Sequence, residues 1–561
     1  MDNVMKLLGR AMDKDFWKEV RESDKYKSQV ARVAKFWDEL KDKPILAHKY
    51  SDFCLFAKTG NRAIYEKGYF ERHGALFSSA MLVLIYPEKE EYLDRLMDEI
   101  YAICDEYTWC LPAHQPTPEK NNNCHLDLFA CETGYALAEI YTLLGDRLEP
   151  LILDRIRVEI DRRITTPYMN KRFGWEHGNN NWATVCMGSV ACTMMLMHPE
   201  LVKDLIPRFD ETVECFLSGF EDDGMCLEGC GYWHYGFGFF VMYADMIRTF
   251  TNGEVDYFKR EKVKTIATFM QKMFLSGGAS VSFADGGRSV SYATWLLHYL
   301  KKEYPDDIII YSPKYSANGV GKFCTHYRTF LYYNDEYATN YADDSGSRET
   351  YAADSQWLVK RTPNYGFAAK GGCNYESHNH NDVGTFIFAK NGRQMVVDMG
   401  SGKYTRQYFD NSTRYTFIEC SSKGHNLPSI GENYQGYGRQ FKANDVKYEN
   451  GVFSMDITSA YEPIEGLNSI KRSFSFTDEA VTLNDKIDYN GNEKIIERLI
   501  ALVKPELCDG YVKIDEACAY FDKDKYDVEI VTEIRKENVG ECYLVTFTLK
   551  DGVKEFTVEI R

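Results

Sequence analysis

Three histidines in the second half of the chain could take part in binding a metal ion. His378 and His380 lie two residues apart in ESHNHNDVG, and His425 lies in SSKGHN. Residues two apart on a strand point to the same face. Asp398, at the end of VVDMG, supplies a carboxylate from the neighbouring strand. Two histidines and a carboxylate are typical of a zinc site with an open fourth position; the alternative is that these loop histidines only make hydrogen bonds.

A run of asparagines in the first half could bind an acidic sugar. GWEHGNNNWATV (174–185) includes Asn180 and Asn181 just before a predicted helix. One asparagine is expected to cap that helix. A remaining amide could hydrogen-bond a sugar carboxylate, and Trp182 could stack on the face of a sugar ring.

Two further segments add residues of catalytic type. DDGMCLEGCGYWHYGFGFF (222–240) contains Tyr232 and Tyr235, although a buried tyrosine more often belongs to the core. SFADGGRSV (282–290) contains Arg288, which could equally be a surface charge. These segments predict a polar, aromatic site only if the fold brings them together.

The first half has the periodicity of helices. Apolar segments of helical length alternate with Gly-, Pro- and Asn-rich connections. We predict helices over residues 131–146, 148–164, 182–198, 263–277 and 291–304. Paired helices of this kind pack in a ring or a solenoid.

The second half changes to the alternation of strands. Residues 384–400 predict two short strands around a turn at Asn391 and Gly392. Alternating segments continue to the C-terminus and indicate an antiparallel sandwich or stacked sheets. We therefore predict a helical domain over 1–310, a linker that begins the sheet domain over 311–350, and a β domain over 351–561.

Composition and charge exclude several classes of protein. Of the 561 residues, 44% are hydrophobic and 27% charged, which excludes a disordered or fibrous chain. The net charge of −17 disfavours a nucleic-acid binder. No apolar run reaches the roughly 18 residues of a membrane span, so no membrane partner is expected. No secretory signal begins the sequence and the 16 cysteines form no short framework, so we expect a cytoplasmic protein, or a secreted or periplasmic one whose signal was removed.

Taken in order, GNNNW, EGCGYWHYG, ESHNHNDVGTFIFAKNGRQMVVDMG and GHN resemble the heparinase II/III-like polysaccharide lyases. The resemblance extends from about residue 100 to 430, and its most specific part is the ordered His-x-His, Asp and Gly-His-Asn motif. It implies an α+β multidomain fold, with an N-terminal incomplete (α/α) toroid, a C-terminal antiparallel β-sandwich and the active cleft between them. It also implies β-elimination of a uronic-acid-containing poly- or oligosaccharide of the glycosaminoglycan or alginate type, which gives unsaturated uronate products.

The resemblance also implies roles for individual residues. His380, Asp398 and His425 fall on the metal positions, usually zinc in a structural role, and His378 falls on the catalytic histidine. Asn180 or Asn181 falls on the residue that neutralises the uronate carboxylate. The catalytic tyrosine is Tyr232 or Tyr235, and Tyr235 is favoured because Tyr-Gly also marks the catalytic tyrosine of other toroidal lyases. The candidates for substrate binding are His177, Trp182, His234, Arg288, Arg406, Tyr408, Arg414 and Tyr415.

The sequence departs from the family at one point. Several relatives place a histidine directly after the neutralising asparagine, whereas here the run ends in Trp182. A histidine base at that position is therefore not expected, and His177 or His234 could replace it.

Two other functions fit the same residues. A toroidal glycoside hydrolase would need two opposed carboxylates, for which the candidates are Glu176, Asp222, Asp223 and Glu228. A non-catalytic glycan-binding protein could keep the same fold without the chemistry. The sequence does not predict an oligomeric state, the particular glycan, or endo against exo cleavage.

Overall fold

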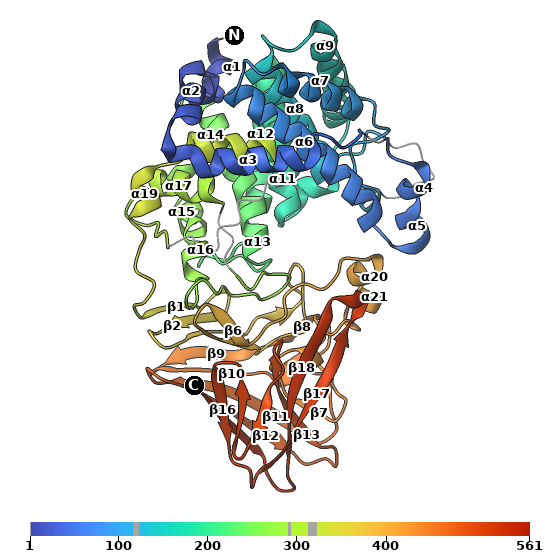
Figure 1. Ribbon diagram of the computed structural model, residues 1–561. Coiled ribbons are helices and arrows are strands. Elements are labelled where there is room, and N and C mark those ends of the chain that lie inside the picture. Colours follow the sequence, from blue (N-terminus) through green and yellow to red (C-terminus); the bar gives the residue numbers. More distant parts are fainter. Residues whose placement is uncertain (1, 46, 116–122, 290–292, 312–321) are drawn as a thin grey trace.

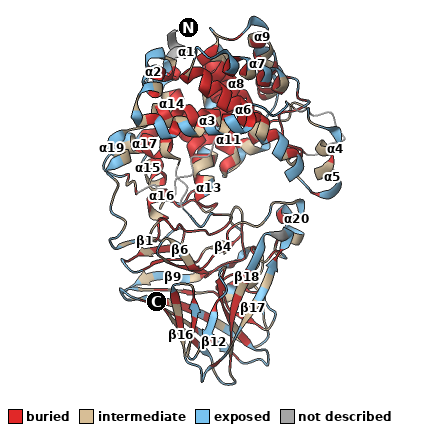
Figure 2. Cartoon of the chain, viewed as in Figure 1, coloured by how far each residue is buried: buried red, intermediate tan, exposed pale blue. Residues whose placement is uncertain are grey.

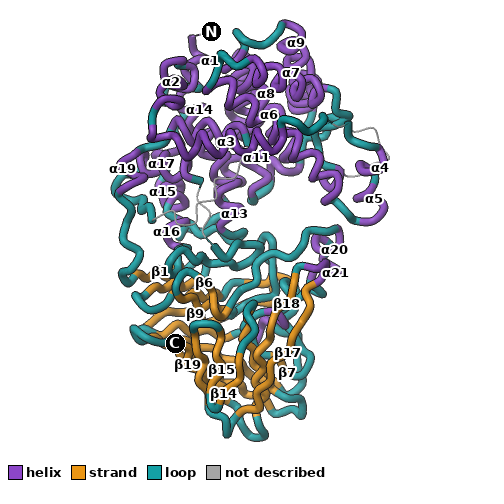
Figure 3. Tube along the Cα trace, viewed as in Figure 1, coloured by secondary structure: helices purple, strands orange, loops and turns teal. Residues whose placement is uncertain are grey.

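A helical domain is followed by a domain of antiparallel sheets, which confirms the predicted fold class (Figure 1). The computed structural model describes residues 2–45, 47–115, 123–289, 293–311 and 322–561. Helices and strands separate almost completely along the chain, and the two small helices α20 and α21 of the β domain face the helical domain (Figure 3).

The helical domain has two layers. Its longer helices are α3 (Lys27–Leu40), α6 (Ala63–Ile85), α7 (Glu90–Cys104), α8 (Leu128–Leu144), α9 (Pro150–Ile160), α11 (Asn181–Met197), α12 (Pro199–Leu217) and α14 (Gly238–Phe250). Helices α6, α8 and α11 are mostly buried at their centre, whereas α3, α7 and α12 bury one face only (Figure 2). An outer helix needs only one apolar stripe because one face is buried, whereas an inner helix is apolar on most sides because it is covered all round.

Shorter helices complete the domain. They are α1 (Asp2–Leu7), α2 (Lys14–Glu22), α4 (Tyr50–Phe53), α5 (Leu55–Thr59), α10 (Thr166–Asn170), α13 (Cys230–Tyr232), α15 (Glu261–Ala267), α16 (Phe269–Lys272), α17 (Thr294–Glu303), α18 (Phe323–Leu331) and α19 (Asp335–Thr339). Residues 323–339, which the sequence analysis assigned to the linker, are thus largely helical, and residues 312–321 of that linker lie outside the described residues. The predicted helix over 291–304 begins at Thr294, and residues 291–292 also lie outside them.

The β domain contains one large sheet, two medium sheets and a small one. A five-stranded sheet has the order β1 (Arg348–Ala352), β2 (Trp357–Arg361), β3 (Gly366–Lys370), β5 (Phe386–Lys390), β6 (Arg393–Val396). An eight-stranded sheet has the order β14 (Glu506–Cys508), β15 (Tyr511–Ile514), β16 (Ala517–Phe521), β19 (Glu555–Ile560), β12 (Val481–Tyr489), β11 (Leu467–Phe476), β10 (Val452–Asp456), β9 (Asn444–Glu449). The others are β17 (Tyr526–Arg535), β18 (Gly540–Leu549), β13 (Ile495–Ala501), β7 (Ser429–Ile430), and the pair β4 (Cys373–Asn374), β8 (Gly438–Lys442).

The central strands β2, β3 and β5 of the five-stranded sheet are buried on both faces, and this sheet joins the two domains. On β2, Trp357 and Val359 pack into the core of the helical domain, whereas Leu358 packs into the core of the β domain. On β3, Ala368 packs into the core of the helical domain and Phe367 into the core of the β domain. Because side chains alternate along a strand, apolar residues are needed on both sides of a strand when both faces of the sheet are covered. Loops at the edge of this sheet therefore face the helical domain.

The predicted hairpin over 384–400 is confirmed. Strands β5 and β6 pair antiparallel, and Asn391 and Gly392 between them both have positive φ, 50° and 81°. This is the conformation that favours Asn-Gly in a two-residue hairpin. Asp398 follows β6 by two residues, so the hairpin fixes where its carboxylate lies. Within the described part of the chain, no helix is both long and apolar enough to cross a membrane.

Candidate active site

A cavity of about 930 Å³ lies between the two domains. Its helical wall includes Asn180, Asn181, Trp182, Glu228, Tyr232 and Tyr235. Its β-domain wall includes His378, Tyr404, Arg406, Arg414 and Tyr415. The fold thus brings most of the predicted site residues into one cavity, although they come from segments up to about 230 residues apart.

The asparagine run ends at the start of α11. Asn180 is the N-cap, and its side-chain oxygen accepts a hydrogen bond from the backbone N–H of Trp182 at 3.1 Å. The predicted cap is therefore Asn180. Asn181 is buried, and both its backbone N–H and its Nδ2 donate to the Glu228 carboxylate, at 3.1 and 3.0 Å. The Asn181 amide is thus already bound, while the capping bond of Asn180 uses only its oxygen.

His378 is held in a single orientation at the edge of the cavity. The spacing of His378 and His380 predicted that both lie on one strand, but both lie in the loop after β4, and His378 has a positive φ of 55°. Such backbone strain in a non-glycine residue is typical of functional sites. Its Nδ1 lies 2.6 Å from the Asp285 carboxylate, and its Nε2 faces Glu228 at 3.9 Å. Arg414 holds the loop by donating to the carbonyl oxygens of His378 and Asn379.

Asp285 connects both histidines to two tyrosines. Its carboxylate accepts hydrogen bonds from Tyr404 at 3.0 Å and Tyr408 at 2.5 Å, and lies 3.1 Å from Nε2 of His380. Burial alone would raise the pKa of Asp285, but the bonds from His378 and His380 outweigh it and hold the pKa well below its usual value. Asp285 is therefore an anion on which the β-domain loops converge.

The two candidate tyrosines have different partners. The Tyr232 ring stacks on His378 with centroids 4.1 Å apart, and its hydroxyl lies 2.8 Å from that of Tyr404. Tyr235 donates to the Glu132 carboxylate, which also pairs with Lys322. Burial raises the pKa of both tyrosines, so neither ionises readily without a proton acceptor.

The backbone around Tyr235 explains its position. Trp233–Phe237 form a π-helical turn between α13 and α14, a distortion often found at functional sites. A Cβ on Gly236 would lie 3.0 Å from the Cα of Asn181. The glycine therefore lets this turn pack closely against the start of α11, which places Tyr235 beside the asparagine run.

Solved structures of known enzymes share this arrangement of domains. Neither protein-family models nor curated protein sequences give a match to the chain. Heparinase III superposes with a TM-score of 0.60 at 13% sequence identity, covering 100% of this chain and 93% of that one. The chain has the heparinase III fold. The resemblance inferred from the motifs is thus confirmed at the level of the fold.

Two further structures are similar over most of their length. A mutant heparan sulfate lyase from Pedobacter heparinus gives a TM-score of 0.56 at 12% identity, covering 99% of this chain and 91% of that one. The chondroitin AC lyase of Streptomyces coelicolor, in complex with chondroitin sulphate, gives 0.57 at 10% identity, covering 100% and 82%. The structures that share the heparinase III fold with this chain thus include lyases of acidic glycosaminoglycans.

Two buried histidines near the cavity have the hydrogen-bond pattern of metal ligands. His380 Nε2 contacts Asp285, and its Nδ1 has no hydrogen-bond partner among the described residues. His425 Nε2 lies 2.9 Å from the carbonyl oxygen of Glu419, while its Nδ1 has no hydrogen bond and lies 3.2 Å from Oδ2 of Asp398. A ligating histidine typically donates from one nitrogen to an acceptor and binds the metal through the other.

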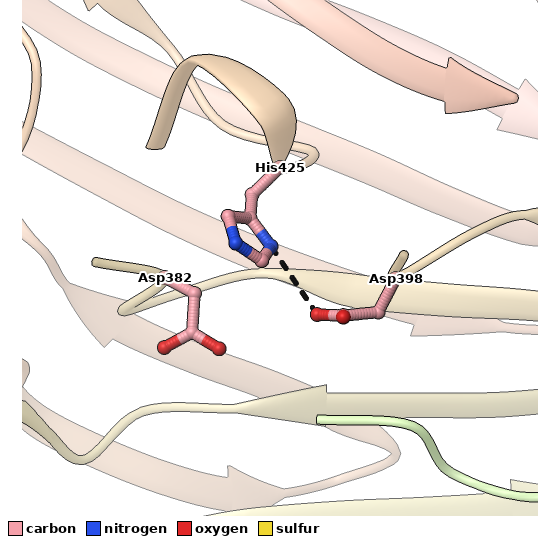
Figure 4. A group of neighbouring side chains, drawn as sticks. All are labelled: Asp382, Asp398 and His425. Atoms are coloured by element: carbon pink, nitrogen blue, oxygen red, sulfur yellow. Dashed lines mark ion pairs between the residues drawn. The ribbon is translucent and has the colours of Figure 1, made fainter. Parts of the chain in front are cut away.

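The carboxylates around these histidines fit a metal ion. Asp382, Asp398 and His425 present potential ligand atoms that lie within 4.8 Å of one another (Figure 4). The ring of His380 lies 5.5 Å from that of His425. The second oxygens of Asp382 and Asp398 are buried without hydrogen-bond partners among the described residues. Nitrogen and oxygen donors of this kind suit zinc. This group contains two of the three ligands expected from the sequence, Asp398 and His425, and adds Asp382, whereas His380 lies beside it.

Several other predicted residues lie in or beside the cavity with their polar groups engaged. Arg406 donates to the carbonyl oxygens of Phe56 and Ala57 in α5, at 2.6 and 2.9 Å, and so ties α20 (Arg406–Phe409) to the helical domain. Tyr415, just after α21 (Asn411–Arg414), stacks on Tyr437 with centroids 4.7 Å apart. Tyr408 is fully buried behind the wall; its hydroxyl donates to Asp285, lies 3.5 Å from Nε2 of His380 and accepts a hydrogen bond from the backbone N–H of Gly402.

Besides Tyr408, three other residues predicted to bind substrate are not among the described residues that line the cavity. His177 pairs with Glu211 at 3.6 Å on the exterior. Nε2 of His234 accepts a hydrogen bond from the backbone of Ala293, and burial lowers the pKa of this histidine to about 4. Arg288 is exposed. These positions give no support to direct contact between these three residues and a substrate in this cavity.

Sequence reasoning missed Asp285, Glu132 and His114. Asp285 gave no signal because it lies in a short loop whose partners come from the other domain. Glu132 did give a signal, since it is one of two acids, with Glu139, in the otherwise largely apolar segment of α8. His114 lines the cavity, contacts Asp127 at 2.8 Å and packs against Trp182.

Proposed function

We propose that this protein is a polysaccharide lyase that cleaves uronic-acid-containing glycans by β-elimination. The observation that carries the proposal is the cavity between the domains, where His378, fixed by Asp285, faces the start of α11 and its asparagines. The lyases named above, which share the fold, support the reaction class. The substrate is an acidic oligo- or polysaccharide; the net charge of −17 is no obstacle, because Arg62, Arg406 and Arg414 lie at the cavity itself.

Asn180 is the better candidate for binding the uronate carboxylate. The Asn181 amide is occupied by Glu228, whereas the capping bond of Asn180 leaves its Nδ2 as a donor. The N-terminus of the 17-residue helix α11 adds a partial positive charge at the same place. Neutralising the carboxylate makes the C5 proton more acidic and stabilises the enolate-like intermediate.

Tyr235 is proposed to remove the C5 proton. It packs beside the asparagine run, and the carboxylate is bonded to the carbon that loses the proton, so base and carboxylate ligand must lie close together. Glu132 accepts the hydrogen bond of the Tyr235 hydroxyl and is placed to take its proton, while the Lys322 ammonium lies 4.3 Å from the ring centre and stabilises the phenolate.

The elimination then balances as follows. The phenolate takes the proton from C5, the electron pair of that bond forms the C4–C5 double bond, and the bond from C4 to O4 breaks. The leaving oxygen receives a proton from Tyr235, or from Tyr232 next to His378. The products are a new non-reducing end with an unsaturated uronate and a free hydroxyl on the other fragment.

We also propose that His380, Asp398 and His425 hold a zinc ion, with Asp382 beside them. Bound zinc would supply a structural cross-link between the hairpin β5–β6 and the loop that precedes β7. His380 is two residues from His378 and both contact Asp285, so this cross-link would keep His378 at the cavity. The catalytic work falls to the side chains of the cavity.

A screen of uronate polymers and oligosaccharides tests the proposal. Heparan sulfate, hyaluronan, chondroitin and alginate are incubated with the protein, and the ultraviolet absorbance of the unsaturated uronate is followed. A hydrolase would release reducing ends without that absorbance. Of the acids considered for hydrolysis, only Glu228 lines the cavity, while Glu176 is buried against Arg208, so we expect the lyase product.

A further inference from the structure

A second cavity, of about 790 Å³, lies within the helical domain. It is enclosed by residues 47–50, by α4, and by the end of α7 with the turn that follows it. It shares no described lining residue with the cavity between the domains. A small aromatic cluster separates the two: Phe53 and Tyr65 face the second cavity, and Phe129 faces the first.

Aromatic side chains surround the mouth of this second cavity. Tyr50, Tyr101 and Tyr107 line it and are exposed, by 79%, 47% and 52%. Phe53 packs edge-on against Tyr107, with centroids 5.7 Å apart. Large exposed aromatic groups gathered at one cavity mark a binding site more often than a bare surface. Their flat faces suit the apolar face of a sugar ring.

The floor of the cavity is charged. Arg72 donates to the Glu106 carboxylate at 2.5 Å, and the side chains of both are more than nine-tenths buried. Burial alone would raise the pKa of Glu106, but His48, whose Nε2 lies 3.5 Å from the carboxylate, and the positive charge of Arg72 outweigh it and lower the pKa. The second oxygen of this ionised carboxylate has no hydrogen-bond partner among the described residues. A buried acceptor of this kind needs a donor.

We propose that the second cavity binds one pyranose unit of a glycan. Stacking on the tyrosines at the mouth would hold the ring, and a sugar hydroxyl would donate to Glu106 at the floor. An apolar ligand would leave the second oxygen of Glu106 without a donor. A phosphorylated ligand would meet Asp105 and Glu106 as well as Lys49. The inference concerns binding alone and does not depend on the proposed cleavage reaction.

Calorimetric titration of the full-length protein tests this inference. His378→Ala serves as the background, so that no oligosaccharide is cleaved during the titration. Cellotetraose is the neutral probe and a hyaluronan tetrasaccharide is the uronate probe. The double substitution Tyr50→Ala with Tyr101→Ala removes two exposed rings, and the exposed Leu151→Ala is the matched control.

We expect the double substitution to weaken binding of at least one probe by about tenfold or more, since each stacked ring contributes a fraction of that factor. Leu151→Ala should leave the affinity unchanged. If the double substitution weakens binding of the neutral probe alone, the ligand is a neutral sugar. If it weakens binding of the uronate probe, the cavity is a second subsite for an acidic glycan. Equal affinities in the double variant and its background, or no binding of either probe, overturn the inference. Failure of the cleavage screen would not produce these results, because binding is measured without turnover.

Discussion

Replacing Asp285 with Asn should slow catalysis strongly while leaving the protein folded. The substitution keeps the shape of the side chain but removes the anion that orients His378. It also turns one acceptor oxygen into a donor that faces groups which themselves donate. His378, Tyr404 and Tyr408 all depend on this carboxylate. Asp285 is therefore a positioning residue, because it acts through His378.

The magnitude follows from the bonds that are lost. A hydrogen bond to a charged group contributes about 1.5–3 kcal/mol. If the bond to His378 is the one that matters for turnover, kcat should fall by roughly 10- to 150-fold. Losing one partner of a buried ionic network costs about 3–5 kcal/mol of stability, below the total of many folded proteins.

The assay is initial-rate production of unsaturated uronate, with circular dichroism and zinc content measured on the same samples. Tyr408→Phe is the matched control, because it removes one donor to Asp285 and leaves the His378 contact in place; we expect it to change kcat by less than about tenfold. A folded, metal-loaded Asp285→Asn protein with kcat within about threefold of wild type would refute the positioning role.

Four further predictions concern the base, the carboxylate ligand, the metal and acid stability. Tyr235→Phe should abolish turnover and Tyr232→Phe should reduce it less, as measured by product absorbance on folded protein; the reverse order would make Tyr232 the base. Asn180→Ala should raise the activation free energy by about 2–3 kcal/mol, which lowers kcat roughly 30- to 150-fold. An effect on KM alone would contradict the proposed stabilisation of the intermediate. Elemental analysis should find about one zinc per chain, and a chelator should lower the melting temperature; a metal-free protein of equal stability would contradict the metal site. Burial lowers the pKa of His73 and of His326 from 6.5 to about 4. The stability that their neutral forms contribute is therefore complete above about pH 6.5 and is lost as the pH falls toward 4. Melting temperatures that do not change between pH 6.5 and pH 4 would contradict this contribution of the two histidines.

Motifs predicted the parts of the site that lie within single segments. The Asn391–Gly392 turn fixed the hairpin, and the asparagine run marked the start of α11, because both signals are local. The meeting of His378 with the asparagine run was expected only through resemblance to a family, since it depends on how two domains pack. Residue periodicity alone contains no information on that packing.

The residues that were missed or misplaced failed for physical reasons. Asp285 becomes informative only when its loop meets the β domain, and no sequence neighbour shares its role. Arg288, three residues later, attracted attention because of its charge, yet it is exposed. The linker prediction failed to find α18 and α19 because Gly- and Ser-containing stretches on either side of them dominate its composition.

The most direct test of the central claim is the nature of the bond-breaking product. Wild-type protein, Tyr235→Phe and His378→Ala are each incubated with the uronate glycans, and the products are separated and analysed by mass and ultraviolet absorbance. We predict that wild type gives oligosaccharides whose new non-reducing end lacks one water and absorbs as an unsaturated uronate, and that both variants give little or none. Products that contain the added water, or cleavage that persists in both variants, would contradict β-elimination in this cavity.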